Sequence, residues 1–570
     1  MPDPAPHPPR GPAGLPPEAV WLGLDLGTQS ARCVAVDSAG TVLAAASRPL
    51  TSHRDGVRHE QDPEEWWTAL TVACREATAA LDEPARVRGL ALDATSGTLL
   101  LADGRGGPLT PGLMYDDGRA TDQAARVNAV GGAVWGELGY RSMQASWALP
   151  KLLWLLEHTR AAACPDARVL HQPDLVTWRL AGRQVASDAS HALKTGYHLV
   201  DERWPAEEFA ALGVPARVLP DVVRPGSVLG TVCGAAAEAT GIPEGTAIVA
   251  GMTDGCAAQI GAGALAPGAW NSVLGTTLVL KGTSPHLVRD PGGVVYCHRG
   301  PGGTWLPGGA SSSGAGVLAR EFPGADLARL TAAGAALDGD AVAYPLVSTG
   351  GERFPFRAAD ATPFVLGTPR GEAGLFHAHL LGVACVERLC LDYLDRIGAP
   401  VDGPLTFTGG GARNAYWNQL RADVLGRAVR VPEQAEGAIG MAVLAATSSG
   451  VPVRDAADAM VRPGAEIRPD PARTARWTPV YLGFVDALAA RGWLAPEVAA
   501  HARARAHRPQ PAARGAVTEA EHRTEPEADH RSESEADHRS APDAGLGAVT
   551  EADHRAAPRA DHRQARGTAQ

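Results

Sequence analysis

Two aspartates beside glycine-rich turns are the residues best suited to chemistry. They lie in Leu24-Asp25-Leu26-Gly27-Thr28-Gln29-Ser30 and in Gly251-Met252-Thr253-Asp254-Gly255. Further glycine-rich turns follow at Leu274-Gly275-Thr276-Thr277 and at Thr408-Gly409-Gly410-Gly411-Ala412-Arg413-Asn414. Glycine lets backbone N–H groups approach a phosphate closely, and a neighbouring hydroxyl adds a donor. Together these segments predict an ATP site with a catalytic carboxylate.

The elements around the first turn decide what kind of phosphate site it is. A P-loop or dinucleotide fingerprint places its glycine loop between a strand and a helix. Here Val20 to Leu26 and the run Cys33 to Val36 predict strands on both sides, and Thr41 to Ala46 predicts a third. The middle turn repeats this layout between Trp270 to Leu274 and Leu278 to Leu280. Two such hairpins predict a duplicated nucleotide-binding domain with ATP between the halves.

The late turn has a different layout. Leu405 to Phe407 predicts a short strand, and Asn414 to Leu425 predicts an amphipathic helix that ends at Gly426. A strand, glycines and a helix in this order leave bare backbone against which a base or ribose can lie.

Phosphoryl transfer needs bound phosphates, a magnesium ion and a group that orients the attacking hydroxyl. Asp25 faces the first turn, and we expect it to hold hydrated Mg²⁺, an ion that keeps most of its waters. Asp254 follows a predicted strand within a glycine turn and can accept the proton of a sugar hydroxyl. The side chains predicted to contact the β- and γ-phosphates, with the backbone of Gly27, are Thr28, Gln29, Ser30 and Arg32.

Each motif alone also has an ordinary structural explanation. The first turn matches a tight hairpin, since short motifs give false positives. Asp254 alone matches a turn aspartate that caps backbone amides. The glycines at 409–411 alone match a plain approach to a helix. Their joint occurrence in this order favours the functional interpretation.

Composition narrows the class of protein. The chain has 570 residues, enough for two or three domains, with 20% charged and 45% hydrophobic residues. Its formal charge of −11 gives no basic footprint for nucleic acid. No spanning apolar run or signal-peptide core is recognisable, so we expect a cytoplasmic protein without a membrane partner. Eight cysteines show no metal or redox spacing, and only three lysines occur among 52 basic residues.

The predicted organisation is α/β with two lobes and a cleft, because strand and helix patterns alternate. Both ends are predicted to be disordered, and the C-terminal one carries Glu-Ala-Asp-His-Arg repeats, which are better explained as a solvated tail than as a metal site. The expected segments are a tail at 1–17, a sugar- and phosphate-binding lobe at 18–261, a nucleotide-binding lobe at 262–435, a segment returning to the first lobe at 436–500, and a tail at 505–570.

In these motifs the chain resembles the FGGY carbohydrate kinases of the actin-like (ribonuclease H-like) ATPase superfamily across nearly all of 20–450. The matching pieces are Gly23 to Thr28, Gly251 to Gly255, Gly275 to Thr277, Gly351-Glu352-Arg353-Phe354-Pro355, Gly409 to Asn414, and Glu436-Gly437-Ala438-Ile439-Gly440. The resemblance implies two actin-like lobes with ATP and sugar between them, and a homodimer is common in the family.

The resemblance also implies roles for individual residues. Asp25 would bind Mg-ATP and Asp254 would be the general base. The second phosphate turn would be Gly275, Thr276 and Thr277. Adenosine would be flanked by Gly410, Gly411 and Asn414, with Trp417 nearby.

The substrate is predicted from the segment Leu92-Asp93-Ala94-Thr95-Ser96-Gly97-Thr98. Xylulokinases usually carry Met-His-Gly here, and Gly97 stands where that histidine would fall. The stretch resembles D-ribulokinases of the xylulokinase-like group, as does Ser187 to Tyr197. We therefore expect D-ribulose to be converted to D-ribulose 5-phosphate, with Asp25, Asp93, Ser96, Asp117 and Asp254 contacting the sugar.

Several alternatives stay open. Asp93 is equally well explained as a buried capping carboxylate, and His191 and Lys194 are better explained as structural or surface residues than as site residues. Asp117 belongs to Leu113-Met114-Tyr115-Asp116-Asp117-Gly118-Arg119, which resembles the family's Trp-x-Asp-x-Arg sugar loop with Tyr115 in place of tryptophan. D-Xylulose and L-ribulose are the rival substrates. A non-catalytic ATP- or sugar-binding regulator on the same fold is the rival function, and a chaperone-like or filament-forming ATPase explains the sugar-loop matches less well.

Overall fold

The computed structural model describes residues 14–337 and 339–507. All of them belong to one compact unit, residues 1–513, and the second unit, residues 514–570, lies outside the described residues. Most of both predicted tails is therefore outside the described part as well. The short described pieces differ from the prediction of disorder. Leu15 is fully buried, and Arg505 lies in helix α16 (Pro496–Ala506), where it pairs with Asp392.

The first large sheet has six strands in the order β12-β13-β6-β1-β2-β3. β1 pairs in parallel with β6, and β6 with β13, whereas β2, β3 and β12 run antiparallel to their neighbours. The predicted hairpin around Gly27 is confirmed. The strands are β1 (Val20–Leu26), β2 (Ser30–Asp37), β3 (Val42–Pro49), β6 (Val87–Ala94), β12 (Val228–Thr231) and β13 (Ala247–Val249).

The second large sheet has seven strands in the order β16-β17-β15-β14-β20-β21-β22. β14 is parallel to β20, and β20 to β21, whereas β15, β17 and β22 are antiparallel to their neighbours. The strands are β14 (Trp270–Leu274), β15 (Leu278–Gly282), β16 (Tyr296–Arg299), β17 (Trp305–Ala310), β20 (Leu405–Thr408), β21 (Val429–Val431) and β22 (Ala465–Ile467).

The two sheets repeat one topology. The series β3-β2-β1-β6-β13-β12 and β17-β15-β14-β20-β21-β22 agree strand for strand in direction, and their first five strands agree in chain order. The edge strands differ, because β12 precedes β13 along the chain whereas β22 follows β21. The predicted duplication and the α/β class are thereby confirmed. One glycine-rich turn joins β1 to β2 and the other joins β14 to β15, so the two turns occupy equivalent positions.

Helices cover both faces of the first sheet. Along β1, Leu22 and Leu24 join the core shared with α1 (Pro63–Ala79), whereas Trp21 joins the core shared with α8 (Asp254–Gly261). Alternate side chains of a strand point to opposite faces, so a doubly covered strand becomes almost continuously apolar. This explains the composition of β1. Two further helices lie on the α1 face, α4 (Gln172–Ala181) and α7 (Gly234–Thr240).

A smaller sheet of β4, β5, β8, β7 and β9 extends the first lobe. Its strands are β4 (His53–Asp55), β5 (Arg58–Gln61), β7 (Leu99–Ala102), β8 (Gly112–Leu113) and β9 (Arg168–His171). Helices around it are α2 (Thr121–Glu137), α3 (Ala148–His158), α5 (Ala189–Ala192) and α6 (Ala206–Ala211). Two-stranded pairs are β10 (Ser187–Asp188) with β11 (Val222–Val223) and β18 (Val342–Ala343) with β19 (Val365–Leu366).

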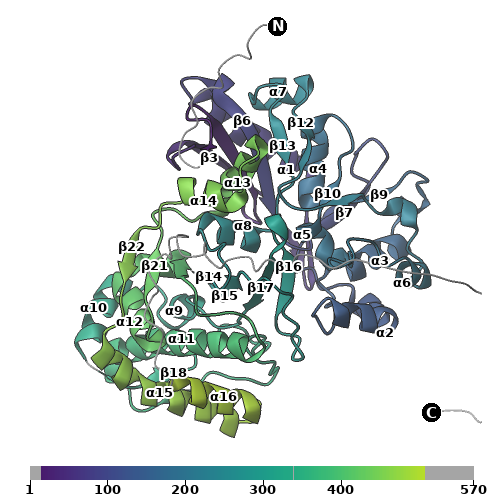
Figure 1. Cartoon of the computed structure of the whole chain (residues 1–570). Helices are drawn as coiled ribbons and strands as arrows, with labels where there is room; N and C mark the ends of the chain where they lie inside the picture. The colour runs from purple at the N-terminus through teal and green to yellow at the C-terminus, as the bar shows by residue number, and fades with distance from the viewer. Residues whose placement is uncertain (1–13, 338, 508–570) are drawn as a thin grey trace, which may run out of the picture. The chain divides into compact units, whose positions relative to one another are not determined.

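The chain returns to the first lobe through α13 (Gly437–Ala446) and α14 (Val453–Met460). Figure 1 shows α13 beside β6 and β13, close to α8. Backbone meets backbone here, because a Cβ on Gly23 of β1 would lie 1.6 Å from the carbonyl oxygen of Ala438. On the other side, a Cβ on Gly440 would lie 2.0 Å from the carbonyl oxygen of Ala257 in α8.

The predicted returning segment is 436–500, but its part after α14 packs on the second lobe. β22 pairs with β21, α15 (Pro471–Ala490) contacts α12 (Ala415–Leu425), and α16 contacts α11 (Gly371–Arg396). Trp477, Tyr481 and Phe484 of α15 are buried in the same core as Phe407. Only the part up to α14 therefore returns to the first lobe, because the apolar face of α15 is buried in the second.

The second lobe is built around α11. This 26-residue helix is the single helix of the described part that is long and apolar enough to cross a membrane, and 89% of its apolar window is buried within the protein. It contacts α10 (Leu327–Ala336) and α12. Helix α9 (Gly316–Glu321) begins against the second glycine turn, since Gly316 N–H donates to the Thr276 carbonyl. The apolar character of α11 is explained by burial on nearly all sides.

A buried ion pair ties α11 to α12 and the sheet. Arg421 donates to both carboxylate oxygens of Glu387, with Nε–Oε2 at 2.7 Å and Nη2–Oε1 at 2.8 Å, and neither side chain is exposed. Ser272 of β14 donates to Glu387 at 2.5 Å, and the guanidinium lies 3.5 Å from the ring centroid of Phe407. Four elements thus share one charged network.

We predict that Arg421→Met lowers the free energy of unfolding by about 3–5 kcal/mol, because it leaves a buried carboxylate without its cation. Urea unfolding followed by fluorescence measures the loss. Arg503→Ala is the matched control, since Arg503 and Asp486 form a half-exposed pair whose loss should cost less than about 1 kcal/mol. Equal, small effects of both changes would contradict the role given to the buried pair.

Candidate active site

Three aspartates, Asp25, Asp93 and Asp254, lie near the ends of the parallel strands of the first sheet. Asp25 of β1 is directly paired with Asp93 of β6, and Ala94 forms a bridge with Thr253, the residue before Asp254. Ligands of α/β proteins bind at these carboxyl ends of parallel strands. Asp254 is exposed and is the first residue of α8, so it lies at a helix N-terminus instead of within the predicted glycine turn.

The buried members of this group repel one another. Burial raises the pKa of Asp93 well above its ordinary value, and the charges of Asp25 and Asp254 raise it further. Burial likewise raises the pKa of Asp25 to about 6, against the lowering effect of Arg32. Asp25 is the hydrogen-bonding neighbour of the Asp93 carboxyl group, and no other described residue donates to it. A Cβ on Gly437, at the start of α13, would lie 2.9 Å from Asp93, so bare backbone covers this carboxyl group.

Each of the two hairpin turns uses one backbone donor internally and leaves its side-chain hydroxyls free. In the first turn Gly27 N–H donates to the Ser30 carbonyl at 3.1 Å, and in the second Gly275 N–H donates to the Thr277 carbonyl at 3.1 Å. Within the described ranges, no protein group hydrogen-bonds to the hydroxyls of the two turns. These hydroxyls are those of Thr28, Ser30, Thr276 and Thr277. They remain free to donate to a ligand, and the phosphate contacts expected from the sequence stay a prediction.

The second turn is held from behind by Glu352 of the Gly-Glu-Arg-Phe-Pro segment. Its carboxylate accepts hydrogen bonds from Ser311 Oγ at 3.1 Å and from Ser312 N–H at 2.5 Å. The neighbouring Gly314 packs on the turn, where a Cβ would lie 2.5 Å from the Cα of Thr277. The hydrogen bonds of Glu352 therefore fix residues 311–313, which pair with Leu278 directly after the second turn.

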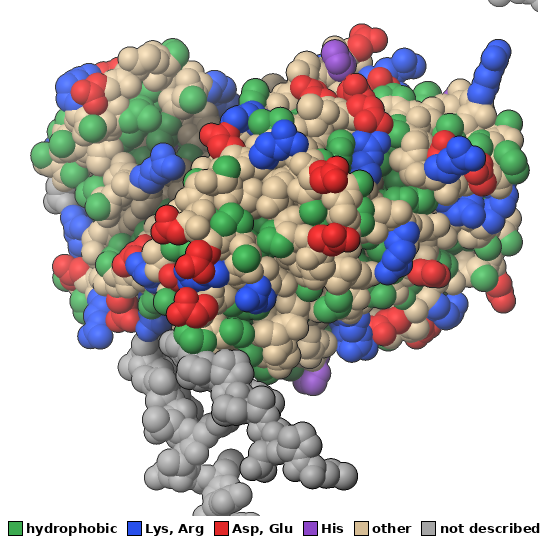
Figure 2. Space-filling view, turned by 90° about the horizontal axis from the view of Figure 1, so that it is seen from above, with side chains coloured by type: hydrophobic (Ala, Val, Ile, Leu, Met, Phe, Trp, Pro, Cys, Tyr) green, Lys and Arg blue, Asp and Glu red, His purple; other side chains and the backbone are tan. Residues whose placement is uncertain are grey.

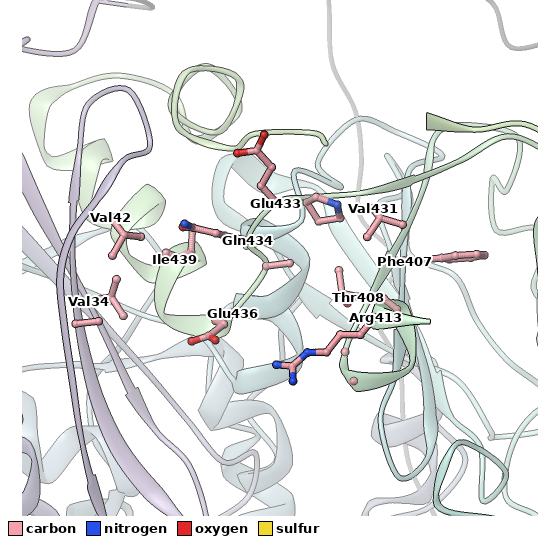
Figure 3. A pocket seen from close by; sticks show the side chains of 16 residues that line it. Val34, Val42, Phe407, Thr408, Arg413, Val431, Glu433, Gln434, Glu436 and Ile439 are labelled. Atoms are coloured by element: carbon pink, nitrogen blue, oxygen red, sulfur yellow. The ribbon is translucent and has the colours of Figure 1, made fainter. Parts of the chain in front are cut away.

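A cavity of about 530 Å³ opens between β2 and β3 on one side and the late glycine turn on the other. Figure 3 shows apolar side chains on opposite walls and the side chains of Arg413 and Glu436 at its edge. The apolar walls are formed by Val34, Val42, Ile439, Val431 and Phe407. Gly410 is exposed in this cavity, and a Cβ there would meet nothing within 4 Å. The cavity fits a nucleoside that lies flat against backbone.

Other residues predicted to flank adenosine have structural roles. Gly411 packs against Leu274, where a Cβ would lie 2.5 Å from the leucine side chain. Asn414 caps α12 by accepting from Trp417 N–H at 3.0 Å, and its amide donates to Thr331. Trp417 is 2% exposed and donates its indole N–H to the Leu380 carbonyl, so its ring is unavailable to a base.

The sugar-binding residues predicted from sequence fall into two groups. Asp93 and Ser96 lie on the strand and loop that face Asp25 and Asp254, and Ser96 Oγ is buried without a partner among the described residues. Asp117 is fully buried and saturated, since it accepts from Arg119 Nη2 at 2.7 Å and from His59 N–H at 2.8 Å. In that loop Tyr115 is the exposed side chain, and the charge of Asp254 acts on its phenol.

Comparison with known proteins agrees with this geometry. Residues 20–261 match the N-terminal domain of the FGGY family of carbohydrate kinases, and residues 270–449 match its C-terminal domain. The chain belongs to the FGGY family of carbohydrate kinases.

Similar members of the FGGY family are named xylulose kinases. The xylulose kinase of Streptomyces coelicolor is 32% identical over 75% of this chain and 87% of its own length. That of Klebsiella pneumoniae is 30% identical over 81% and 96%. The solved xylulose kinase of Rhodospirillum rubrum superposes with a TM-score of 0.73 at 28% identity, covering 83% of this chain and 98% of that one.

Sequence reasoning missed several side chains at the sugar end of this FGGY site. Lys194 donates to the Ser96 carbonyl at 3.0 Å, whereas His191 supports β6 through the Ala94 carbonyl, as its structural explanation predicts. Ser190 accepts from Thr253 N–H at 3.2 Å and lies 3.0 Å from His298 Nδ1. The scarcity of lysine was the available signal, because lysine is otherwise replaced by arginine throughout this chain.

A divalent ion fits the site only together with other ligands. Within the described ranges no three His, Cys, Asp or Glu residues are grouped closely enough to hold a metal ion. Asp25 and Asp93 nevertheless present carboxyl groups beside the first glycine-rich turn. Mg²⁺ commonly uses one or two carboxylates with water and substrate phosphates, so the residues fit an ion carried by ATP.

Charge on the surface is mixed. Figure 2 shows acidic and basic side chains interspersed over one face, without a patch of a single sign. This agrees with the absence of a basic footprint in the sequence.

We predict that Asp25→Asn stabilises the ligand-free FGGY kinase by about 1–3 kcal/mol at neutral pH. The folded pKa of about 6 exceeds the ordinary 3.8, so ionisation favours the unfolded state. The advantage of the variant should grow as pH rises from about 4 to about 6 and stay constant above. Chemical unfolding at several pH values tests this, with Asp486→Asn, in the half-exposed pair with Arg503, as the control expected to change stability by less than about 1 kcal/mol. An Asp25→Asn protein that is less stable at every pH contradicts the prediction.

Proposed function

We propose that this chain transfers the γ-phosphoryl group of ATP to a hydroxyl of a small open-chain sugar, with Asp254 as the general base. The single observation that carries the proposal is the position of Asp254. It is the exposed carboxylate at the strand ends, beside Asp25 and Asp93.

The side chains divide the work of phosphoryl transfer. Asp254 accepts the proton as the sugar oxygen bonds to the γ-phosphorus and the bond to the β,γ-bridging oxygen breaks. Thr28, Ser30, Thr276 and Thr277 hold phosphate oxygens in place. Asp25 holds the hydrated Mg²⁺, which neutralises phosphate charge when bound. We assign adenosine to the cavity beside Gly410, and expect the activity in the cytoplasm.

Among neutral sugars, we propose D-ribulose as the acceptor, with D-xylulose as the alternative that the named relatives support. The segment 92–98 favours D-ribulose because Gly97 replaces the histidine of xylulokinases. Gly97 has φ of 99°, and a Cβ there would lie 3.1 Å from Lys194 Cδ. A histidine at this position would be strained and would displace Lys194, so this sugar pocket has its own shape.

We predict that Asp254→Asn lowers kcat about 10²–10⁴-fold while the Kd for Mg-ATP changes by less than about threefold, because the base acts in the chemical step. Coupled ADP release measures kcat and calorimetry measures ATP binding. Asp486→Asn, an exposed aspartate in α15, is the matched control. Near-normal turnover in Asp254→Asn would remove the base from this residue.

A panel of D-ribulose, D-xylulose, L-ribulose and glycerol tests the neutral acceptor. We expect the highest kcat/KM on D-ribulose, since a site that pairs hydroxyls with buried polar groups discriminates strongly. A preference for D-xylulose keeps the kinase and overturns the interpretation of residues 92–98. Bound ATP without turnover on any sugar would favour the non-catalytic regulator.

A further inference from the structure

Two of the three lysines of this chain meet at one aromatic ring. Lys194 Nζ lies 5.8 Å and Lys281 Nζ lies 5.2 Å from the ring centroid of Tyr296. The third, Lys151, is fully buried and donates to the Leu113 and Met114 carbonyls. In a chain with 52 basic residues, this pairing of rare lysines needs an explanation.

The second sheet directs Lys281 toward Tyr296. Gly308 of β17 is paired with Lys281 of β15 on one side and with Tyr296 of β16 on the other. A Cβ on Gly308 would lie 2.6 Å from Lys281 Cδ, so the glycine lets the lysine lie across the strand. The row Lys281, Gly308 and Tyr296 therefore forms a flat floor with a positive charge on it.

Lys194 reaches the same ring from the first lobe. It lies in a 3₁₀ turn, Leu193–Thr195, and passes over Gly97 to donate to the Ser96 carbonyl. Its Nζ also lies 5.8 Å from the ring centroid of Trp147, which packs edge-on against Tyr296 at 5.6 Å. The absence of a side chain at Gly97 makes this path possible.

Neither lysine has an anionic partner. Throughout residues 14–337 and 339–507, no carboxylate lies within 4.0 Å of either ammonium group. Lys281 is 5% exposed, and its ammonium makes no hydrogen bond to a described residue. Burying a charge without a partner is costly, and placing a second like charge nearby adds to the cost. An anionic ligand between them would remove both penalties.

The lysine pair belongs to the sugar end of the site. His298, two residues beyond Tyr296, contacts Ser190, which in turn contacts Thr253 beside Asp254. Burial, followed by the charges of Lys281 and Lys194, lowers the pKa of His298 well below its ordinary value, so both charges act at this place. Lys281 lies four residues along β15 from Thr277, about 13 Å at the rise of a strand. The pair is thus separated from the phosphate turn by a distance that leaves room for a sugar.

We propose that Lys194 and Lys281 bind a carboxylate at the end of the acceptor remote from the phosphorylated hydroxyl, so that sugar acids of five or six carbons are substrates. The inference rests on the proposed kinase function and adds a substrate class to it. The carboxylate is unchanged in the reaction, while the far hydroxyl loses its proton to Asp254 and gains the phosphoryl group.

Kinetics with matched acids and ketoses test the proposal. D-Ribonate, D-xylonate and D-gluconate are compared with D-ribulose and D-xylulose by ADP release in the wild type, Lys281→Met and Lys194→Met. We expect at least one acid to exceed every ketose about tenfold in kcat/KM. Either substitution should lower the acid-to-ketose ratio at least about thirtyfold, mainly through KM of the acid. Arg503→Ala, remote from the site, is the control expected to keep the ratio.

A binding measurement keeps the inference testable if a lysine variant fails to fold. Thermal melting of the wild type without ATP should shift upward with the acid and little with ketose or inorganic phosphate. Turnover on ketoses alone, with no shift by any acid, overturns the acid site and leaves the kinase intact. A shift by an acid without turnover on any sugar supports the lysine site and refutes the kinase. A larger shift by inorganic phosphate would overturn the carboxylate assignment.

Discussion

The active site depends on the contact of α13 with β1 and α8 at backbone distance. Gly23 and Gly440 carry no side chain where the helix meets the strand and its neighbouring helix, and any Cβ there would overlap a carbonyl oxygen. The contact sets the position of α8, whose first residue is Asp254, and it lays the start of α13 over Asp93. The segment that lines the cavity beside Gly410 at Glu436 thus continues directly into the helix start that covers Asp93.

The arrangement of charged side chains in this site lowers the stability of the ligand-free protein. Burial, followed by the charges of Asp25 and Asp254, raises the pKa of Asp93, and within the described residues Lys194 and Lys281 stand without counter-ions. Mg-ATP brings cationic and anionic groups to the first cluster, and an acidic sugar would bring an anion to the second. The free energy of ligand binding would then offset the repulsion between like charges that remains in the ligand-free protein. Functional sites commonly retain such unfavourable interactions, whereas hydrophobic cores do not.

Local pattern was sufficient to predict much of the frame. The strands around Gly27 and Gly275, the helix from Asn414 to Gly426, and the duplication were predictable because turn residues and alternating apolar residues act within a few positions. The placement of α15 was not, since an amphipathic helix shows that it needs a partner without showing which one. Trp417 illustrates the same limit, because an aromatic beside a glycine turn can face a ligand or the core.

The sequence by itself determined the kinase family, the two glycine-rich hairpin turns and the aspartates near the strand ends, since a short contiguous motif specifies each of them. The tertiary structure alone decided which polar groups are free to act. In the folded chain Asp117 accepts hydrogen bonds from Arg119, and Asn414 caps a helix. Lys194 and Lys281, 87 residues apart in the sequence, lie beside the ring of Tyr296. Availability and proximity depend on contacts between distant segments, and local residue types do not encode them.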